Sequence, residues 1–175
     1  MGVLFVIGGA RSGKSRHAQA RMEALPGQLA FIATAQAFDA EMEDRIARHR
    51  ADRSPRWETF EAPVDLPGAI RNAAQSANAV LVDCLTLWLS NLGLAECDVE
   101  AMTKDLVSTL QDYSIPVALV ANEVGMGIVP ENALARRFRD EAGRLNQHIA
   151  ALAEEVVLVA AGLPLTLKQA GRQCS

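Results

Sequence analysis

The sequence predicts an α/β protein in which a mainly parallel β-sheet is covered by helices on both faces. Several segments are apolar almost throughout, which is typical of strands that are buried on both sides. Stretches with helical periodicity separate these segments, and this alternation predicts parallel strands joined by helices. No linker, repeat or low-complexity segment interrupts residues 1–175, so the chain is predicted to be a single domain.

The first half of the chain supplies the first strands and helices of this pattern. "VLFVI" (3–7) is predicted to be a buried strand, and helical periodicity runs from Lys14 to about Ala24. "PG" at 26–27 ends that helix, because proline and glycine interrupt regular structure. The next expected elements are a strand over "LAFIA" (29–33), an amphipathic helix over 39–53, a short strand over "WETFEAP" (57–63) and a helix over about 65–75.

The second half continues the alternation. "AVLVDC" (79–84) and "VALVAN" (117–122) are strongly apolar and are predicted to be strands. A long helix is expected over 130–155, started by Pro130 and tolerating Gly143. The remaining expected elements are a helical stretch after residue 84, a helix over 98–112, a strand over "VVLVAA" (156–161), a small edge strand over "LTLK" (165–168) and a frayed tail over 169–175.

The composition excludes several classes of protein. Hydrophobic residues make up 50% of the chain and charged residues 22%, a globular balance that argues against disorder. The net charge is -4, whereas a general nucleic-acid binder needs a basic face to neutralise phosphates, so no nucleic-acid partner is expected.

The cysteines and the apolar runs indicate a reduced, cytoplasmic protein. Cys84, Cys97 and Cys174 lie far apart without a CxxC pair, which argues against a disulfide scaffold or a zinc site. No apolar run approaches the ~20 residues of a membrane helix, so no stable membrane insertion is expected. "VLFVI" lacks a basic leader and a cleavage site, and is therefore interpreted as a strand and not a signal peptide.

"GGARSGKS" (8–15) fits the phosphate-binding pattern G-x-x-x-x-G-K-[ST]. It follows a predicted strand and opens a predicted helix, which is the context that the mechanism requires. Backbone N–H groups would surround a phosphate, Lys14 would bridge the β- and γ-phosphates, and Ser15 would bind Mg²⁺. The expected nucleotide-binding residues of this loop are Gly8, Gly9, Ala10, Arg11, Ser12, Gly13, Lys14 and Ser15. The alternative is a glycine-rich turn that matches the pattern by chance.

Asp83 ends an apolar strand, where a P-loop enzyme carries a second acid near its metal. It is therefore expected to bind Mg²⁺ together with Ser15. The alternative is an aspartate that caps the following helix. The guanine-recognition motif N-K-x-D of switch GTPases is absent, because Glu123 stands in "ANEV" (121–124) where that lysine would be.

"RIARHRADR" (45–53) places His49 among four arginines in an acidic chain. A neutral imidazole can attack phosphorus and form a covalent intermediate, and neighbouring arginines would favour that neutral form and grip a triphosphate. On a helix, Arg45 and Arg53 lie one turn from His49 on either side. The cluster suits nucleotidyl transfer, with attack at the α-phosphate. The alternative is a boundary histidine on an amphipathic helix with a solvated basic face.

These motifs together resemble one enzyme family. "GGARSGKS", "FIATAQ", "DAEMEDRIARHRADR", "WETFEAP" and "NEVGMGIVPENALARRFRDEAGRLNQ" are similar to segments of the bifunctional adenosylcobinamide kinase/adenosylcobinamide-phosphate guanylyltransferases of cobalamin biosynthesis. The resemblance extends from Val3 to about Lys168. It implies a P-loop NTPase fold of the RecA-like kind, and the R-I-x-x-H helix and "NEVGMGIVPEN" carry most of its specificity.

The resemblance also implies residue roles. Family members attach GMP to a histidine of the helix after the second strand, and that role falls on His49, so His49 and Lys14 are the expected catalytic residues. Further expected nucleotide-binding residues are Ala33, Thr34, Ala35, Arg50, Ala51, Asp52, Arg53, Glu61 and Asp83. Glu61 would accept from a guanine edge, with a surface carboxylate as the alternative.

The implied activity has two steps. The enzyme would phosphorylate adenosylcobinamide with ATP or GTP, and would then transfer GMP from GTP to the product, giving adenosyl-GDP-cobinamide. The family assembles as a homotrimer. Two other functions stay open: a monofunctional small-molecule kinase in which His49 is structural, and a RecA-like oligomer that assembles on nucleic acid, which the net charge of -4 disfavours.

Other histidines and arginines are expected to be structural. His17 and His148 lie on predicted helices and are interpreted as surface or packing residues. Arg136, Arg137 and Arg139 form a second basic group, interpreted as a solvated face, with contact to phosphate across a subunit boundary as the alternative.

Overall fold

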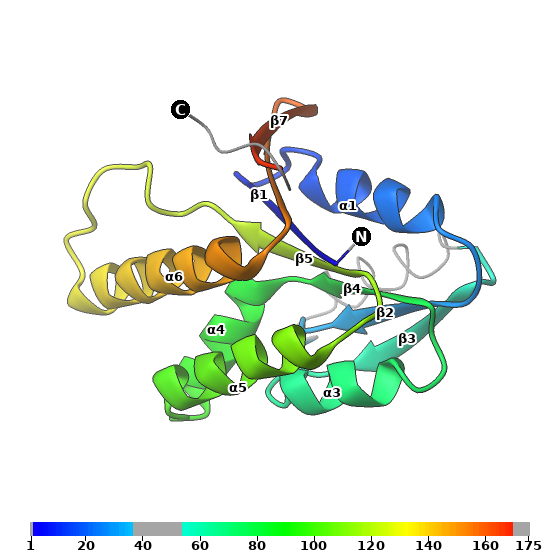
Figure 1. Ribbon diagram of the computed structural model, residues 1–175. Coiled ribbons are helices and arrows are strands. Elements are labelled where there is room, and N and C mark those ends of the chain that lie inside the picture. Colours follow the sequence, from blue (N-terminus) through cyan, green and yellow to red (C-terminus); the bar gives the residue numbers. More distant parts are fainter. Residues whose placement is uncertain (1, 37–53, 170–175) are drawn as a thin grey trace.

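The computed structural model describes residues 2–36 and 54–169 and contains one seven-stranded sheet (Figure 1). Its strand order is β3-β2-β4-β5-β1-β6-β7, with every pair parallel except β6 and β7. The strands are β1 (Val3–Gly8), β2 (Leu29–Ala33), β3 (Trp57–Glu61), β4 (Ala79–Asp83), β5 (Val117–Asn122), β6 (Glu155–Ala160) and β7 (Leu163–Lys168). The described helices are α1 (Lys14–Glu23), α3 (Leu66–Ala73), α4 (Leu85–Leu94), α5 (Val99–Asp112) and α6 (Ala133–Leu152).

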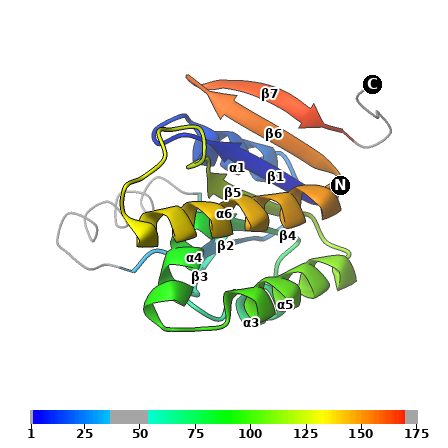
Figure 2. The same ribbon diagram turned by 90° about the vertical axis from the view of Figure 1, so that its left-hand side faces the viewer.

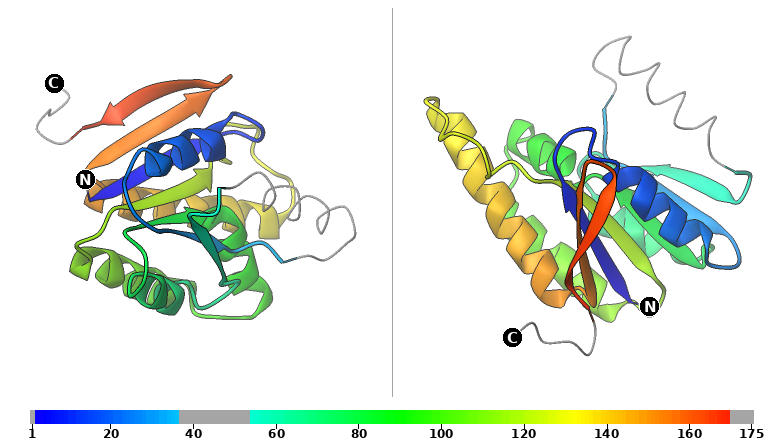
Figure 3. Two further views of the ribbon diagram at one scale, coloured as in Figure 1. Left: turned by 90° about the vertical axis from the view of Figure 1, so that its right-hand side faces the viewer. Right: turned by 90° about the horizontal axis from the view of Figure 1, so that it is seen from above.

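Helices cover both faces of the sheet, as predicted. In β1, Phe5 packs into a core shared with α3, α4, α5 and α6, whereas the alternate residues Leu4 and Val6 face a second core with Ala18 and Met22 of α1. Figure 2 shows α3, α4, α5 and α6 together on one side. Seen from above in Figure 3, α1 and α6 lie on opposite sides of β1. The predicted α/β class is therefore confirmed.

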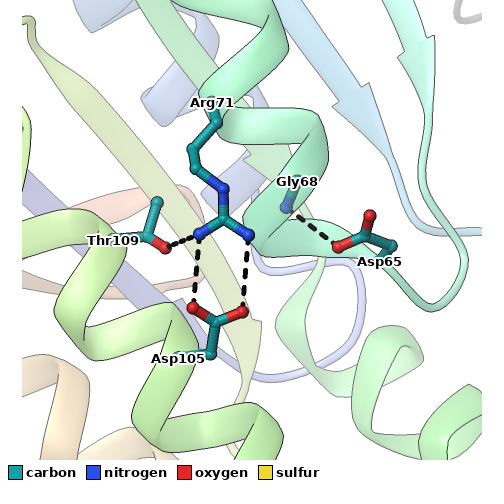
Figure 4. Close-up of polar contacts among 5 residues, drawn as sticks. All are labelled: Asp65, Gly68, Arg71, Asp105 and Thr109. Atoms are coloured by element: carbon teal, nitrogen blue, oxygen red, sulfur yellow. Dashed lines mark hydrogen bonds and ion pairs between the residues drawn. The ribbon is translucent and has the colours of Figure 1, made fainter.

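Side-chain caps determine where α3 and α5 begin. Asp65 accepts from the Gly68 N–H at 2.9 Å at the start of α3, and Asp98 accepts from the Ala101 N–H at 3.0 Å at the start of α5. Figure 4 shows the Asp65 cap beside Arg71, which joins α3 to α5. The Arg71 guanidinium donates to Thr109 Oγ1 at 2.7 Å and to both carboxylate oxygens of Asp105.

The long helix is shorter than the sequence suggested. It was expected over 130–155 with Pro130 at its start, but α6 begins at Ala133, because Asn132 Oδ1 accepts from the N–H groups of Leu134 and Ala135. The helix ends at Leu152, and the chain enters β6 at Glu155.

The remaining element predictions that fall on described residues differ from the structure only in detail. The short strand expected over 57–63 ends at Glu61, and the edge strand expected over 165–168 already begins at Leu163. Gln169, the first residue of the expected tail, still forms a β-bridge. The helix expected over 39–53 and residues 170–175 lie outside the described residues. Within the described ranges, no helix has the length and apolar composition needed to cross a bilayer.

Candidate nucleotide-binding site

The phosphate-binding motif forms the turn between β1 and α1, as the sequence predicts. Gly8 ends the strand where a Cβ would lie only 2.4 Å from the Val159 carbonyl oxygen, so a side chain does not fit there. Gly13 caps α1 with φ 94°, a left-handed conformation that favours glycine. The Gly162 N–H donates to the Ser12 carbonyl at 2.8 Å, so the β6–β7 turn is hydrogen-bonded to the loop.

Lys14 and Ser12 are buried within this turn. Lys14 opens α1 with only 8% of its surface exposed, and its ammonium donates to the Gly9 carbonyl at 3.1 Å. Ser12 Oγ is buried without a hydrogen-bond partner among the described residues. A buried ammonium and an unsatisfied hydroxyl at a helix N-terminus are suited to binding phosphate oxygens, because burial strengthens their electrostatic attraction for anions.

Three predicted residues gather at the carboxyl edge of the sheet beside this loop. Ala33 pairs with Asp83 in the register between β2 and β4, and the Thr34 N–H donates to the Asp83 carbonyl at 3.3 Å. Ala35 follows, half-buried. Glu61 ends β3 in register with Ala33 and is exposed. The structure therefore brings Ala33, Thr34 and Asp83 together and puts Glu61 one strand further out.

The buried thiol of Cys84 indicates how Lys14 and Asp83 are arranged. Burial raises the pKa of Cys84, the negative charge of Asp83 raises it further, and the positive charge of Lys14 lowers it. Both charges therefore act on one thiol, which puts the ammonium and the carboxylate in the same part of the site. The raised pKa also keeps this thiol protonated and unreactive.

Thr34 is held by the main chain of Cys84. It is fully buried, its hydroxyl donates to the Cys84 carbonyl and accepts from the Cys84 N–H, both at 2.8 Å, and the pair joins the end of β2 to the start of α4. The Thr34 side chain, which was predicted to bind nucleotide, therefore fixes the junction between β2 and α4. The Thr34 N–H also bonds to the Asp83 carbonyl.

Replacing Thr34 with valine is expected to lower the free energy of unfolding by about 2–4 kcal/mol, since two buried main-chain groups of Cys84 lose their partner. Chemical denaturation measures this change. Thr34→Ser is the matched control, because it keeps the hydroxyl and removes one methyl group, at about 1 kcal/mol. Equal losses in the two variants would assign the effect to packing and not to the hydrogen bonds.

Two polar residues of α4 support the site and were missed by sequence reasoning. Asn91 is buried and donates to the carbonyl groups of Thr34 and Pro63, at 2.7 and 2.9 Å. Thr86 Oγ1 accepts from the Asn122 N–H at 2.7 Å and so holds the end of β5. The available signal was the presence of polar residues on a mostly apolar helix, "LTLWLSNLGL".

The oxygen donors at this edge fit Mg²⁺. Ser15 offers a hydroxyl and Asp83 a carboxylate, and no group of three or more His, Cys, Asp or Glu residues that could bind a metal exists in the described part of the chain. Mg²⁺ is usually held by one or two protein oxygens together with phosphates and water. A donor set of this size therefore suits a cation that arrives with a nucleotide.

His17 lies half-buried on α1, one turn before Arg21, which links α1 to β6 through two hydrogen bonds to Glu155, at 2.8 and 2.7 Å. Burial lowers the pKa of His17, the charge of Arg21 lowers it further, and Glu155 raises it. The Arg21 hydrogen bonds in turn lower the pKa of Glu155. His17 is thus a packing residue, as predicted, and is neutral in the folded protein near neutral pH.

Acidification below the usual His17 pKa is therefore expected to destabilise the fold, because the unfolded chain binds a proton there that the folded chain resists. The contribution of His17 is complete above its unfolded value of 6.5 and is lost as the pH falls below it. Denaturation at about pH 7.5 and about pH 5.5 measures the loss, which His17→Gln should reduce. Glu155 contributes to the pH dependence only below its usual pKa of 4.5, which lies outside the range from about pH 5.5 to about pH 7.5. An identical loss in the variant would contradict the assignment.

The second basic group is engaged within α6 and with the segment directly before it. Arg136 Nη1 donates to the carbonyls of Pro130 and Glu131, Arg137 pairs with Glu141 at 2.7 Å, and Arg139 pairs with Asp140 at 2.9 Å. These contacts favour the interpretation of a solvated, internally paired face. His49, Arg50, Ala51, Asp52 and Arg53 lie outside the described residues.

Sequence comparison finds close relatives over nearly the whole chain. A family profile described as "Cobinamide kinase / cobinamide phosphate guanyltransferase" matches residues 4–167. The bifunctional adenosylcobalamin biosynthesis protein CobP of Pseudomonas aeruginosa is 47% identical, over 93% of this chain and 95% of that protein. CobU of Salmonella typhimurium, described in the same words, is 42% identical over 95% of this chain and 99% of its own.

Comparison with solved structures finds the same fold in distant proteins. The flagellar accessory protein FlaH from Methanocaldococcus jannaschii has a TM-score of 0.55 at 11% identity, covering 97% of this chain and 79% of that one. The P4 protein of bacteriophage phi6, solved with ADP, has a TM-score of 0.52 at 18% identity, covering 97% and 55%. At these identities the similarity supports the P-loop NTPase fold alone.

Proposed function

The chain belongs to the cobinamide kinase / cobinamide phosphate guanyltransferase family, and from this premise we propose that it completes two successive steps on one corrinoid substrate. Relatives at 42–47% identity are named bifunctional adenosylcobalamin biosynthesis proteins, so the chain is a kinase and guanylyltransferase of cobalamin biosynthesis. The observation that carries the proposal is the phosphate loop with its buried Lys14, which shares the carboxyl edge of the sheet with Asp83.

In the first step the aminopropanol hydroxyl of adenosylcobinamide attacks the γ-phosphorus of ATP or GTP. The new bond joins the hydroxyl oxygen to phosphorus, and the bond to the β–γ bridging oxygen breaks and leaves a nucleoside diphosphate. The loop from Gly8 to Ser15 holds the phosphates with backbone N–H groups, and Lys14 stabilises the charge that develops on their oxygens. Ser15 and Asp83 are the proposed ligands of Mg²⁺, which neutralises phosphate charge when bound.

In the second step His49 is the nucleophile. A neutral imidazole nitrogen of His49 attacks the α-phosphorus of GTP, pyrophosphate leaves, and GMP is joined to the histidine. A phosphate oxygen of adenosylcobinamide phosphate then attacks the same phosphorus and releases the histidine, giving adenosyl-GDP-cobinamide. Support comes from the resemblance of the R-I-x-x-H segment and from its arginines, which favour a neutral imidazole by charge repulsion.

The remaining nucleotide contacts are proposed on the same basis. Residues 33–35 and Asp83 lie at the edge where nucleotides bind to parallel sheets. Glu61 is exposed at that edge and is proposed to accept hydrogen bonds from guanine. The set is completed by Arg50, Ala51, Asp52 and Arg53, which follow the proposed nucleophile directly in the sequence.

Radiolabel transfer tests the proposed function. Adenosylcobinamide with γ-labelled ATP is expected to give labelled adenosylcobinamide phosphate, and α-labelled GTP is then expected to label adenosyl-GDP-cobinamide. Transfer from ATP without transfer from GTP would leave a monofunctional kinase with a structural His49. Absence of both transfers would remove the proposed function altogether.

The assembly is proposed to be a cytoplasmic homotrimer. The resemblance supports this, and so does the edge strand β7, where Leu163 is 73% exposed and Leu165 is 59% exposed in the single chain. Light scattering on the purified protein should give three times the mass of one chain. A monomer mass at working concentration would overturn the trimer and leave the chemistry untouched.

A further inference from the structure

Glu123 directly follows β5, the strand that lies between β1 and β4 (Figure 1). Its N–H donates to the Gly8 carbonyl at 3.0 Å, so its main chain is bonded to the first residue of the phosphate loop. Gly8 also pairs with Asn122 in the register of the two strands. Glu123 is therefore the first residue after β5, and it lies at the carboxyl edge of the sheet between the phosphate loop, which follows β1, and Asp83, which ends β4.

The carboxylate of Glu123 is held in place on one side only. Oε1 accepts from the Gly125 N–H at 2.5 Å, and no other described residue bonds to the carboxylate. The side chain is half-buried, and a Cβ on Gly125 would lie 3.0 Å from Oε1, closer than nearly all real Cβ contacts. A bulkier residue at position 125 would therefore crowd the Glu123 carboxylate. The second carboxylate oxygen of Glu123, Oε2, can accept a proton.

The kinase step needs such a group. An alcohol is a weak nucleophile, and a positioned base that takes its proton contributes roughly 10²–10⁴-fold to the rate. The other described carboxylates at this edge are less suitable. Asp83 is assigned to the metal, and Glu61 ends β3, which β2, β4 and β5 separate from β1.

We propose that Glu123 is the general base of the phosphorylation step, an inference that rests on the proposed function. The carboxylate accepts the hydroxyl proton of the corrinoid as its oxygen bonds to the γ-phosphorus, and the nucleoside diphosphate leaves with the electron pair of the broken bond. The proton then passes from Glu123 to solvent. The guanylylation of His49 uses no substrate hydroxyl and so does not need this group.

The segment after Glu123 leaves room for a large acceptor. Met126 is 80% exposed and Ile128 is 98% exposed, and a Cβ on Gly127 would meet nothing within 4 Å. Figure 1 shows this segment running outward from β5 before it returns to α6. A corrinoid, which is larger than a nucleotide and partly apolar, can therefore approach the carboxylate from this side.

Glu123→Gln tests the proposal, because glutamine keeps the size and the hydrogen bond to Gly125 but cannot accept the proton. We expect phosphorylation of adenosylcobinamide by ATP to fall by roughly 10²–10⁴-fold, while labelling of the protein by α-labelled GTP stays within about two-fold of wild type. Glu131→Gln, an exposed position of the same loop, is the matched control and should leave both rates unchanged.

Two results would overturn the assignment. Phosphorylation within about three-fold of wild type would show that no base is lost. Equal loss of phosphorylation and protein labelling would show that Glu123 shapes the phosphate loop instead. Failure of the proposed function itself is recognised separately, because wild-type protein would then transfer no phosphate to the corrinoid.

Discussion

Replacing His49 with alanine is expected to abolish labelling of the protein by α-labelled GTP, by at least ~10³-fold, because the variant lacks the proposed nucleophile. Phosphorylation of adenosylcobinamide should persist, since the phosphate loop, Ser15 and Asp83 are unchanged. The bound label in wild-type protein should be acid-labile and alkali-stable, as a phosphoramidate is, and γ-labelled GTP should leave none. Denaturing gels of the two proteins measure the difference.

His148→Ala is the matched control for that experiment. His148 lies exposed on α6, so its removal tests whether any histidine would serve. Labelling that persists in His49→Ala but not in His148→Ala would transfer the nucleophile to α6. Labelling lost from both variants, with normal folding, would show that loss of label does not by itself identify the histidine that carries GMP.

The sheet and its order of elements could be predicted because parallel strands buried on both faces have few polar residues. "VLFVI" and "VALVAN" carry this signal without interruption. The boundaries were harder. Pro130 and Asn132 are both helix-start signals, and only the structure shows that Asn132 caps two N–H groups while Arg136 takes the Pro130 and Glu131 carbonyls.

The phosphate loop was predictable for a different reason. Its glycines, lysine and serine are adjacent in sequence, and the motif carries its own geometry. The supports of Thr34 lie 50 and 57 residues away, at Cys84 and Asn91, and no local pattern links them. Glu123 gained its interpretation only from the strand order, which puts β5 beside β1. Positions that depend on non-local pairing are therefore the part of the site that sequence reasoning missed.

Replacing Lys14 with methionine is expected to lower both activities, each by roughly 10²–10³-fold, because both begin with a triphosphate whose charge Lys14 is proposed to neutralise. The free energy of unfolding is expected to stay level or to rise. Methionine fills a similar volume, and it removes an ammonium that is buried to 92% and bonded to a single carbonyl, Gly9. Activity assays combined with chemical denaturation measure the two effects.

Opposite signs in these two measurements would distinguish a functional charge from a structural one. Substitution of a residue that stabilises the fold lowers activity and stability together. Substitution of a buried charge that is retained for catalysis lowers activity but leaves the free energy of unfolding level or raises it. Lys104→Met is the matched control, because Lys104 is exposed on α5 and pairs only with Glu100 four residues away. A Lys14 variant that unfolds more easily than wild type would mean that the ammonium bond to Gly9 stabilises the turn. Lys14 would then hold the conformation of the phosphate loop in addition to supplying its positive charge.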